Sequence, residues 1–492
     1  MGRMWDTDTS WWATSLYAAA LTALHFVVMG AAAGHVVLTK RDNRAAIGWV
    51  GIILLTPFIG AALYFTFGVN RIQRRARRIA RITPASPKIP LVAAPISATE
   101  VQRVTAVHAE QLAPLADFVH RVTHQPMASG NLVEPLRDGD QAYEQMLAAI
   151  EGAKETVGLC TYIFDNDAIG RTFADALARA AERGVEVRVL IDDVGARYSW
   201  PSIKRYLRQK GVRFATFLPT LLPWKLHYTN LRNHRKVLVV DGRIGFTGGM
   251  NIRQGHCCTN PGSYPIVDMH FRLAGPVVAQ LQDTFVHDWE FSTGEHLDLP
   301  RWFPHIEPQG ESFCRGIADG PDLEAQKISL VLLGAIACAK HSITIVTPYF
   351  LPEQPIITAL AVADLRGVDV RVLLPERNNL RLVQWASTAQ LWQVLQRGVR
   401  VWLTPPPFDH TKVMIVDDSW AFVGSANWDA RSLRLNFEFN VECYDRSLAG
   451  SLRALIDAKL QSAREITLSD VDGRPLWMRL RDGIARLATP YL

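Results

Sequence analysis

The stretch "RGVEVRVLIDD" at residues 183–193 recurs as "RGVDVRVLLPE" at residues 366–376. Each copy follows a helical pattern that a glycine ends, and each then reads as a short apolar strand. Upstream, "ETVGLCTYIF" matches "HSITIVTPYF", and downstream, "KGVRFATFLP" matches "RGVRVWLTPP". Strands that alternate with helices predict a sheet flanked by helices. The chain is therefore an internal repeat, and we expect two pseudo-twofold-related α/β lobes with mostly parallel sheets.

The repeat and the local composition divide the chain of 492 residues into four parts. We predict a transmembrane hairpin with a basic juxtamembrane segment at 1–81, a linker at 82–125, a first lobe at 126–300 and a second lobe at 301–492. The linker is indicated by the Pro- and Ala-rich stretch "TPASPKIPLVAAPISATE". No pattern in the sequence indicates an oligomeric state.

Two long runs without Asp, Glu, Lys or Arg mark the N-terminal part, from Ala13 to Leu38 and from Ala45 to Asn70. Each exceeds the roughly 20 apolar residues that cross a bilayer as a helix. A cleaved signal peptide would have a much shorter apolar region. We therefore expect a transmembrane hairpin of two helices and a multi-pass membrane protein.

Lysine and arginine residues beside these runs set the expected orientation. The two outer flanks carry seven, namely Arg3 and six arginines between 71 and 81, and the loop between the runs carries three. We therefore expect both flanks, and with them the lobes, in the cytoplasm. The segment "RIQRRARRIAR" is a candidate contact for anionic lipid headgroups, with a solvated stop signal as the alternative.

The formal net charge of +6 lies in this N-terminal part, because residues 1–81 hold ten Lys or Arg and three Asp. The rest of the chain is nearly neutral, whereas an enzyme that acts on nucleic acid usually carries a basic working surface. The six cysteines include no CxxC pair, which argues against a disulfide framework and against a metal site. We expect them to be mostly buried small residues in a reducing compartment.

The strongest signal is a second pair of copies, "NHRKVLVVDGRIGFTGGMN" at 233–251 and "DHTKVMIVDDSWAFVGSAN" at 409–427, which align without a gap. A single H-x-K-x(4)-D pattern arises by chance in roughly a few per cent of chains this long, but two copies in register do not. The paired candidates are His234 and His410, Lys236 and Lys412, Asp241 and Asp417, and Asn251 and Asn427.

These residue types suit the chemistry of a phosphodiester. One histidine can attack phosphorus while a second protonates the leaving group, and lysine and asparagine side chains can donate to the phosphoryl oxygens. No carboxylate cluster or Cys/His spacing accompanies them, so we predict an exchange through a phosphohistidine without a metal or other cofactor. Strand parity directs Asp241 and Asp417 away from their histidines. We expect these two at the turns, holding loops across the lobe pair.

Each histidine also needs a carboxylate that orients its ring. Glu438 lies 28 residues after His410 on the alternating strand "NFEFNVE", and Asp268 lies 34 residues after His234 on "VDMHFRL". We expect Glu438 to hold a protonated His410 and to raise the pKa of that ring. A surface position is the alternative for both carboxylates.

The paired motifs, "TPYFLP" at 347–352 and the N-terminal apolar runs resemble the phospholipase D superfamily, and within it the bacterial cardiolipin synthases. The resemblance implies a phosphatidyltransferase of the bacterial inner membrane that moves a phosphatidyl group from one phosphatidylglycerol to another and releases glycerol. It implies membrane phospholipids as partners and His234 as the nucleophile. The implied catalytic set is His234, Lys236, Asp241, His410, Lys412 and Asp417, with Asn251 and Asn427 binding phosphate.

One difference between the copies bears on that site. Gly249 stands in the first copy where Ser425 stands in the second, so we expect an asymmetric phosphate cradle.

Other readings use the same residues. A hydrolytic phospholipase D would take water as the acceptor, and phosphatidylethanolamine or another alcohol could replace the second phosphatidylglycerol. A nuclease of the superfamily is disfavoured by the near-neutral lobes and the apolar runs, so we expect no nucleic acid partner.

The last segment, "PLWMRLRDGIARLATPYL" at 475–492, places apolar and basic residues at helical spacing. Either it lies on the membrane with Trp477, Leu480, Ile484 and Leu487 on one face, or it is a terminal helix packed on the second lobe.

Overall fold

The computed structural model describes residues 8–40, 43–68, 112–219, 231–297, 299–320 and 326–489. The chain forms two compact units, Met1–Arg75 and Ala76–Leu492. The arginine-rich segment 71–81 and most of the predicted linker lie outside the described residues.

The first apolar run forms one long helix, α1 (Asp8–Thr39). Its stretch Thr14–Thr39 has 26 residues and is long and apolar enough to cross a membrane. At 1.5 Å per residue this stretch is about 39 Å long, which exceeds the roughly 30 Å of a hydrocarbon core.

The second apolar run folds back on itself. It forms α2 (Asn43–Leu55), α3 (Pro57–Leu63) and a π-helical turn, η1 (Tyr64–Gly68). Pro57 lacks an N–H group and begins a new helix, and the chain reverses there. The reversal brings the Tyr64 ring to 5.6 Å from the Trp49 ring. With 13 residues, α2 is only about 20 Å long. A short helical hairpin therefore replaces the predicted second spanning helix.

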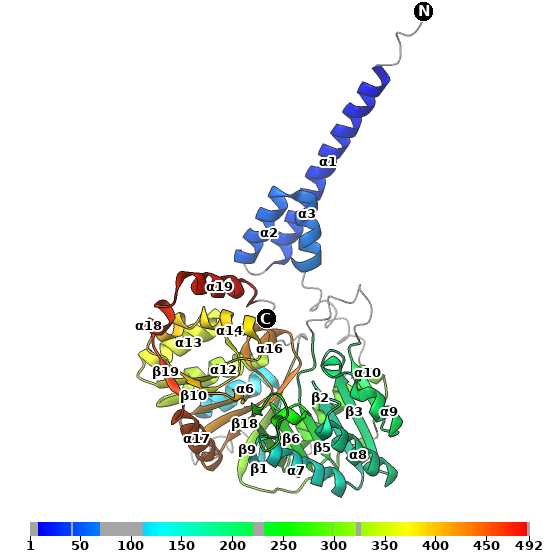
Figure 1. The fold of residues 1–492 in the computed structure, drawn as a ribbon, viewed down its shortest axis with the longest axis vertical. Helices are drawn as coiled ribbons and strands as arrows, with labels where there is room; N and C mark the ends of the chain where they lie inside the picture. The colour runs from blue at the N-terminus through cyan, green and yellow to red at the C-terminus, as the bar shows by residue number, and fades with distance from the viewer. Residues whose placement is uncertain are drawn as a thin grey trace, which may run out of the picture. The chain divides into compact units, whose positions relative to one another are not determined.

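This hairpin packs on the C-terminal half of α1 (Figure 1). Ala32 and Val36 of α1 are buried against Ile53, Ala61 and Tyr64. The Tyr64 hydroxyl lies 2.8 Å from the His35 ring nitrogen and 3.1 Å from the Thr39 hydroxyl. Both ends of the hairpin thus lie beside the Thr39 end of α1, so the chain enters and leaves the hairpin on that side.

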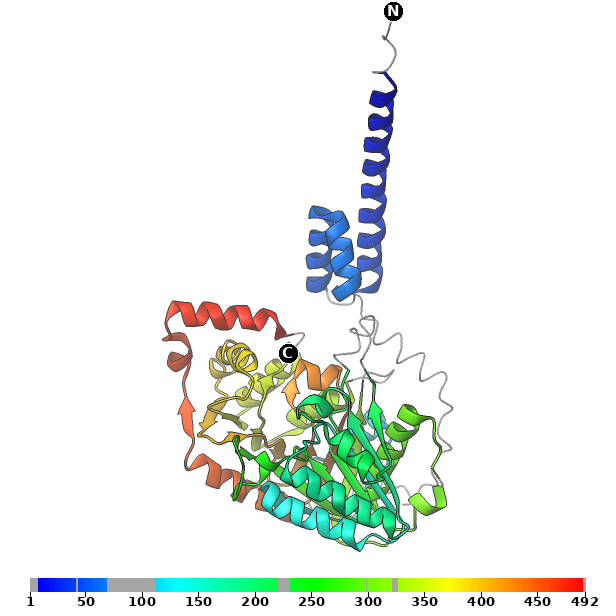
Figure 2. The same cartoon turned by 45° about the vertical axis from the view of Figure 1, so that its right-hand side comes forward.

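The larger unit is built on one sheet of 15 strands that runs through both lobes (Figures 1 and 2). The first lobe contributes the strands β1 (Ala128–Arg137), β2 (Thr156–Thr161), β3 (Glu186–Asp192), β4 (Phe214–Phe217), β5 (Val237–Val240), β6 (Ile244–Gly248) and β8 (Met269–Ala274). The second lobe contributes β9 (Ser312–Asp319), β10 (Ser342–Val346), β12 (Asp369–Pro375), β13 (Arg400–Thr404), β15 (Val413–Val416), β16 (Trp420–Gly424), β18 (Glu438–Tyr444) and β19 (Arg464–Ile466).

The strand order confirms the repeat. It is β4-β3-β2-β5-β6-β8-β1 in the first lobe and β13-β12-β10-β15-β16-β18-β9 in the second, with β19 added at the outer edge. The lobes join where β1 pairs with β9 in antiparallel orientation. A pseudo-twofold axis therefore passes through the seam of a continuous sheet.

Parallel pairing is found in the three outer strands of each lobe, β2-β3-β4 and β10-β12-β13. The strands nearer the seam pair antiparallel. The motif strands must do so, because β5 and β6, like β15 and β16, are joined by turns too short for a crossover. The predicted α/β fold is confirmed, and parallel pairing within the large sheet is confined to β2-β3-β4 and β10-β12-β13, whereas β19 pairs antiparallel at the outer edge of the second lobe.

Helices cover both faces of the sheet, as Figures 1 and 2 show. One face packs on α10 and α17, in a core that both lobes share. The other face packs on α7 and α8 in the first lobe and on α6, α12 and α13 in the second. The helices are α6 (Ala113–Thr123), α7 (Asp138–Gly152), α8 (Ala168–Glu182), α10 (Val277–Thr293), α12 (Lys327–Cys338), α13 (Gln354–Leu365) and α17 (Arg446–Leu460).

The helix α6 changes one predicted boundary. It lies in the predicted linker, yet Leu115, Ala116 and Val119 are buried together with Val331 and Ala335 of α12. Its apolar stripe at helical spacing makes this segment part of the second lobe's core.

Four of the six cysteines, Cys160, Cys257, Cys314 and Cys443, are buried, as the sequence predicted. Cys338 is half-buried and Cys258 is exposed.

Candidate active site

Backbone pairing holds each motif histidine against the opposite lobe. The N–H of His234, just before β5, donates to the carbonyl oxygen of Phe437 at 2.9 Å. The N–H of His410, just before β15, donates to the carbonyl oxygen of Val267 at 2.7 Å. Two short parallel contacts surround these bonds, Asn233 with Phe437, and β14 (Phe408–Asp409) with β7 (Ile266–Val267).

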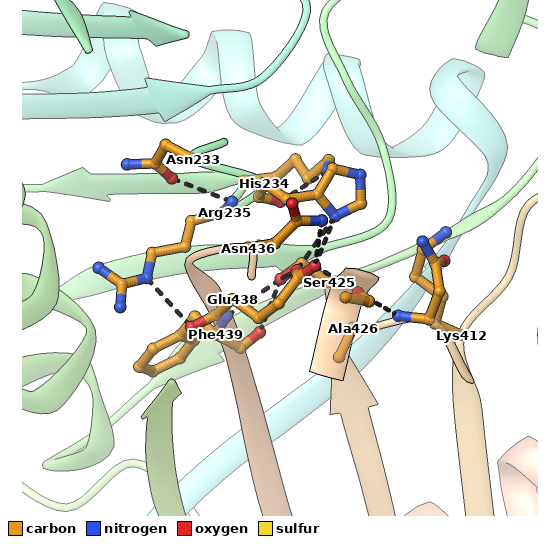
Figure 3. Close-up of polar contacts among 12 residues, drawn as sticks. Asn233, His234, Arg235, Lys412, Ser425, Ala426, Asn436, Glu438 and Phe439 are labelled. Atoms are coloured by element: carbon orange, nitrogen blue, oxygen red, sulfur yellow. Dashed lines mark hydrogen bonds and ion pairs between the residues drawn. The ribbon is translucent and has the colours of Figure 1, made fainter. Parts of the chain in front are cut away.

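An acidic residue follows each of those carbonyl groups in the chain, and its carboxylate forms a hydrogen bond with the histidine ring. Both carboxylate oxygens of Glu438 lie 3.0 Å from Nδ1 of His234 (Figure 3). Oδ2 of Asp268 lies 2.7 Å from Nδ1 of His410. A carboxylate at this distance accepts a hydrogen bond from Nδ1–H and so keeps the ring proton on Nδ1, which leaves the Nε2 lone pair free for chemistry.

Both predicted carboxylates therefore reach a histidine, but the predicted pairing is wrong. Glu438 orients His234 of the other lobe, not His410 of its own. Spacing along one lobe cannot reveal such an exchange, because it arises where two strand ends cross the pseudo-twofold axis.

Each carboxylate is held differently. The hydroxyl groups of Ser425 and Ser432 and the amide of Asn436 donate to Glu438, with distances of 2.5 Å from Ser425 and 3.2 Å from Asn436 (Figure 3). Although burial opposes it, His234 and Lys236 keep the pKa of Glu438 below its ordinary value. Glu438 is thus a fixed, ionised acceptor behind His234.

Asp268 has fewer donors. The N–H of Met269 donates to Oδ1 at 2.8 Å. A Cβ at Gly249 would lie 2.5 Å from the same oxygen, so this glycine leaves the space that Asp268 occupies. Burial raises the pKa of Asp268, and Lys412 opposes the rise. The difference between Gly249 and Ser425 therefore changes how the two carboxylates are held: Ser425 donates a hydrogen bond to Glu438, whereas Gly249 leaves room for Asp268.

The motif lysines are buried beside the histidines. Nζ of Lys236 donates to the carbonyl oxygen of His234, and Nζ of Lys412 to that of His410, both at 2.6 Å. Burial lowers the pKa of Lys236 to about 7 and the pKa of Lys412 to about 8. Each ammonium group keeps donors for a phosphoryl oxygen, since it has three N–H groups.

Both histidines are neutral at neutral pH in this arrangement. Burial lowers the pKa of His234 to about 4, although Glu438 opposes the change. Burial, Lys412 and Lys236 lower the pKa of His410 well below its ordinary value. The expected rise in the pKa of His410 is therefore wrong, because burial beside two ammonium groups disfavours a third positive charge.

Asp241 and Asp417 lie in the turns of the β5–β6 and β15–β16 hairpins, at the ends of β5 and β15 that are away from the histidines. The carboxylate of Asp241 accepts the N–H groups of Lys154, Glu155 and Thr156 at 2.8 to 3.2 Å. Asp417 accepts the three corresponding groups, from Lys340, His341 and Ser342. Both have the predicted place at a turn, but each binds a loop of its own lobe, not one across the pair.

The motif asparagines follow β6 and β16 and are buried. Oδ1 of Asn251 accepts the N–H of Ile163 at 3.0 Å. Oδ1 of Asn427 has no hydrogen-bond partner among the described residues. The first amide is therefore oriented by its own lobe, whereas the oxygen of the second has no such bond.

Aromatic rings from outside the two paired motifs, and not among the predicted site residues, also line the site. The Tyr162 ring lies 5.4 Å from the His234 ring and 5.7 Å from Nζ of Lys236. The rings of Tyr349 and Phe408 lie 6.3 Å and 5.8 Å from the His410 ring. The two tyrosines lie one alignment position apart in the matched stretches "TYIF" and "TPYF", just after paired strands, so that place was a usable signal.

A third histidine also approaches the site. The buried His256 ring lies 6.3 Å from the His410 ring, and its Nδ1 is 4.0 Å from Oδ2 of Asp268. Burial lowers its pKa to about 3. His256 is therefore neutral and packs beside Asp268 without forming an ion pair that would compete with His410.

Two family models match this chain. One described as "Cardiolipin synthase, PLD-like domain" matches residues 146–289 and 332–460, and thus both lobes. Another, described as "Phospholipase_D-nuclease N-terminal", matches residues 27–68.

Curated relatives match nearly the whole chain. Cardiolipin synthase A of Pseudomonas entomophila is 35% identical over 468 residues, which are 94% of this chain and 95% of that protein. The major cardiolipin synthase of Bacillus subtilis is 32% identical over 471 residues, 92% and 95% of the two chains. Among solved structures, phosphatidylserine synthase of Haemophilus influenzae has a TM-score of 0.59 at 15% identity, over 77% of this chain and 100% of that one. This last likeness concerns the fold.

The lysine pKa values predict how catalysis depends on pH. Lys236 is charged below about pH 7 and Lys412 below about pH 8, so binding of an anionic phosphodiester weakens as the pH rises through these values. We expect kcat/KM, which reports the free enzyme, to fall across this range. In Lys236→Arg the guanidinium stays charged, so the fall at about pH 7 should disappear and the fall at about pH 8 should remain. A wild-type plateau up to the ordinary lysine range near pH 10 would contradict the buried ammonium groups.

Proposed function

Because the chain belongs to the family of phospholipase D-like cardiolipin synthases, we propose that it makes cardiolipin and glycerol from two molecules of phosphatidylglycerol. It is a phosphatidyltransferase, and phospholipids of the membrane are its substrates. The observation that carries the proposal is the pair of histidines, each backed by a carboxylate from the other lobe. Such a pair supplies a nucleophile and a proton donor to a single phosphodiester.

In the first step, Nε2 of His234 attacks the phosphorus of the first phosphatidylglycerol, and a P–N bond forms. The bond from phosphorus to the glycerol oxygen breaks. His410 is neutral in the free site and takes up a proton at Nε2 when the bound anionic phosphodiester offsets the two lysine charges, and it gives that proton to the leaving oxygen. The ammonium groups of Lys236 and Lys412 stabilise the negative charge on the phosphoryl oxygens. Asn251 and Asn427 are the proposed amide contacts of the same group.

In the second step, the glycerol hydroxyl of another phosphatidylglycerol gives its proton to His410 and attacks phosphorus. The P–N bond breaks, and cardiolipin leaves. The proton that His410 lent in the first step is thereby returned, so the cycle balances without a metal.

The environment of Glu438 supports His234 as the nucleophile. Phosphorylation of Nε2 makes the ring cationic while Nδ1 keeps its proton, and an ionised carboxylate at 3.0 Å stabilises that cation. Contacts with His234 and Lys236 hold the pKa of Glu438 down, whereas burial raises that of Asp268. The Asp268–His410 pair is therefore the better proton carrier.

We also propose that this membrane enzyme crosses the bilayer once. The hairpin of α2 and α3 returns to the Thr39 side of α1 at Gly68, so in this proposed topology the chain beyond Gly68 starts on that side. Nine Lys or Arg then stand there, three at positions 40, 41 and 44 and six within 71–81, against Arg3 on the other side. This bias supports a topology with the lobes in the cytoplasm and the N-terminus outside. The ratio of nine to one in this single-span topology is a stronger charge bias than the ratio of seven to three in a two-span topology.

Product analysis tests the transfer. With phosphatidylglycerol labelled in its phosphate as the sole lipid, we expect labelled cardiolipin and one glycerol per product. Labelled phosphatidic acid in place of cardiolipin would indicate water as the acceptor and contradict the proposal. Added phosphatidylethanolamine should leave the products unchanged, and His234→Ala is the inactive control.

Labelling that is quenched with alkaline detergent, in which a P–N bond survives, tests the roles of the histidines. His234→Ala should form no covalent intermediate, because the nucleophile is missing. His410→Ala should retain label on the protein, because the second step lacks its base. Label retained on His234→Ala but absent from His410→Ala would reverse the two roles.

Cysteine labelling in intact cells tests the topology. An impermeant maleimide added outside should label Thr7→Cys and should not label Asp42→Cys or Ser86→Cys. Labelling at position 42 but not at position 7 would restore the two-span hairpin. The wild type is the matched control, because its exposed Cys258 should react only after the cells are opened.

A further inference from the structure

The C-terminal helix α19 (Leu476–Leu487) carries an apolar stripe on its outer face. Its large apolar side chains are 58% to 76% exposed, namely Leu476, Trp477, Leu480, Ile484 and Leu487. Four of them are the residues that the sequence placed on one helix face. Singly exposed apolar residues are common, but five on one short helix mark a binding surface.

The opposite face of α19 packs on the second lobe. Ala485 is buried with Val383 and Ala386 of α14 (Arg381–Thr388) and with Leu351. The guanidinium of Arg481 lies 4.4 Å from the Trp385 ring centroid. The helix is therefore a firmly seated part of the lobe, and its exposed stripe is presented in a fixed direction.

Positive charge flanks the stripe. The segment 474–487 holds four arginines and one acidic residue, Asp482. Asp482 is buried and pairs with Arg474 and Arg481. Arg479 and Arg486 form no ion pair with any described residue, so they add uncompensated positive charge beside the apolar side chains.

An open groove of about 540 Å³ adjoins the same stripe. It lies between α19 and the short helices α15 (Trp392–Leu395) and α18 (Leu468–Asp472). Its lining combines apolar side chains with three arginines and one aspartate, and includes Trp392, Leu468, Leu476, Leu480, Arg474, Arg479, Arg486 and Asp472. The surface is thus amphipathic beyond the helix itself.

Only one layer of residues separates α19 from the active site. Tyr349 packs against the cluster that holds Ala485, Leu351 and Val383. The Tyr349 ring in turn lies 6.3 Å from the ring of His410. A surface bound by α19 would therefore be close to the site of transfer.

We propose that α19 docks on the surface of a bilayer containing anionic phospholipid and presents the active site to substrates in that bilayer. An apolar stripe bordered by arginines is the composition of helices that lie in the headgroup region. Charge complementarity with anionic headgroups favours this occupant over a second copy of the chain. The proposal rests on the proposed function, because a phosphatidyltransferase must reach lipid in a membrane.

Two variants of the full-length protein test it, Arg479→Glu/Arg486→Glu and Leu480→Ser/Ile484→Ser. They alter exposed or half-exposed side chains, so the thermal unfolding temperature should not change. On long-chain phosphatidylglycerol in vesicles we expect kcat/KM to fall at least roughly tenfold in each variant. Each basic residue and each buried apolar side chain contributes to the free energy of binding to an anionic membrane surface. On short-chain phosphatidylglycerol dissolved as monomers we expect no change. Arg205→Glu/Arg208→Glu on α9 (Ile203–Gln209) is the matched charge control.

Each other outcome has a distinct meaning. Equal losses of kcat/KM on both substrates would show that α19 only stabilises the lobe, and would overturn the docking proposal. Unchanged activity on vesicles would overturn it as well, as would an equal loss in the α9 control. A wild type that transfers no phosphatidyl group from either substrate would instead refute the proposed function.

Discussion

The hydrogen bonds from His234 to Glu438 and from His410 to Asp268 cross the interface between the lobes, and the site depends on them. Each bond needs the continuous sheet at the β1–β9 seam and the short backbone contacts at Phe437 and Val267. Neither lobe alone holds an oriented histidine. The repeat therefore builds one composite site, which explains why both copies of the motif are intact in a single chain.

Burial gives the site its reactivity. Two carboxylates, two ammonium groups and two imidazoles share a space from which water is largely excluded, so each charge alters its neighbours. The lysines disfavour protonated histidines and leave Nε2 nucleophilic, and the carboxylates keep the lysines partly charged. Removing one partner would leave an uncompensated buried charge, which is strongly destabilising in proteins. Stability and catalysis therefore constrain the same residues.

Much of this was readable from the sequence, and the failures have physical causes. The gapless alignment of the two motifs predicted the paired histidines and lysines, and strand periodicity singled out Glu438 and Asp268. The exchange of partners was not predictable, because spacing reports contacts within a lobe. Pro57 was read as part of a spanning run, although a residue without an N–H group permits a reversal. The Pro- and Ala-rich composition before α6 favours a linker, but the apolar spacing within α6 makes it part of the core.

The exchange of carboxylates between the lobes is the central claim, and histidine-selective nitrogen NMR of the detergent-solubilised protein tests it most directly. The bonded Nδ1–H groups of His234 and His410 should give separate signals, assigned with His234→Ala and His410→Ala. We predict that Glu438→Gln shifts the signal of His234 and leaves that of His410 in place, and that Asp268→Asn does the reverse. A shift of the His410 signal alone in Glu438→Gln would contradict the composite site and restore pairing within each lobe.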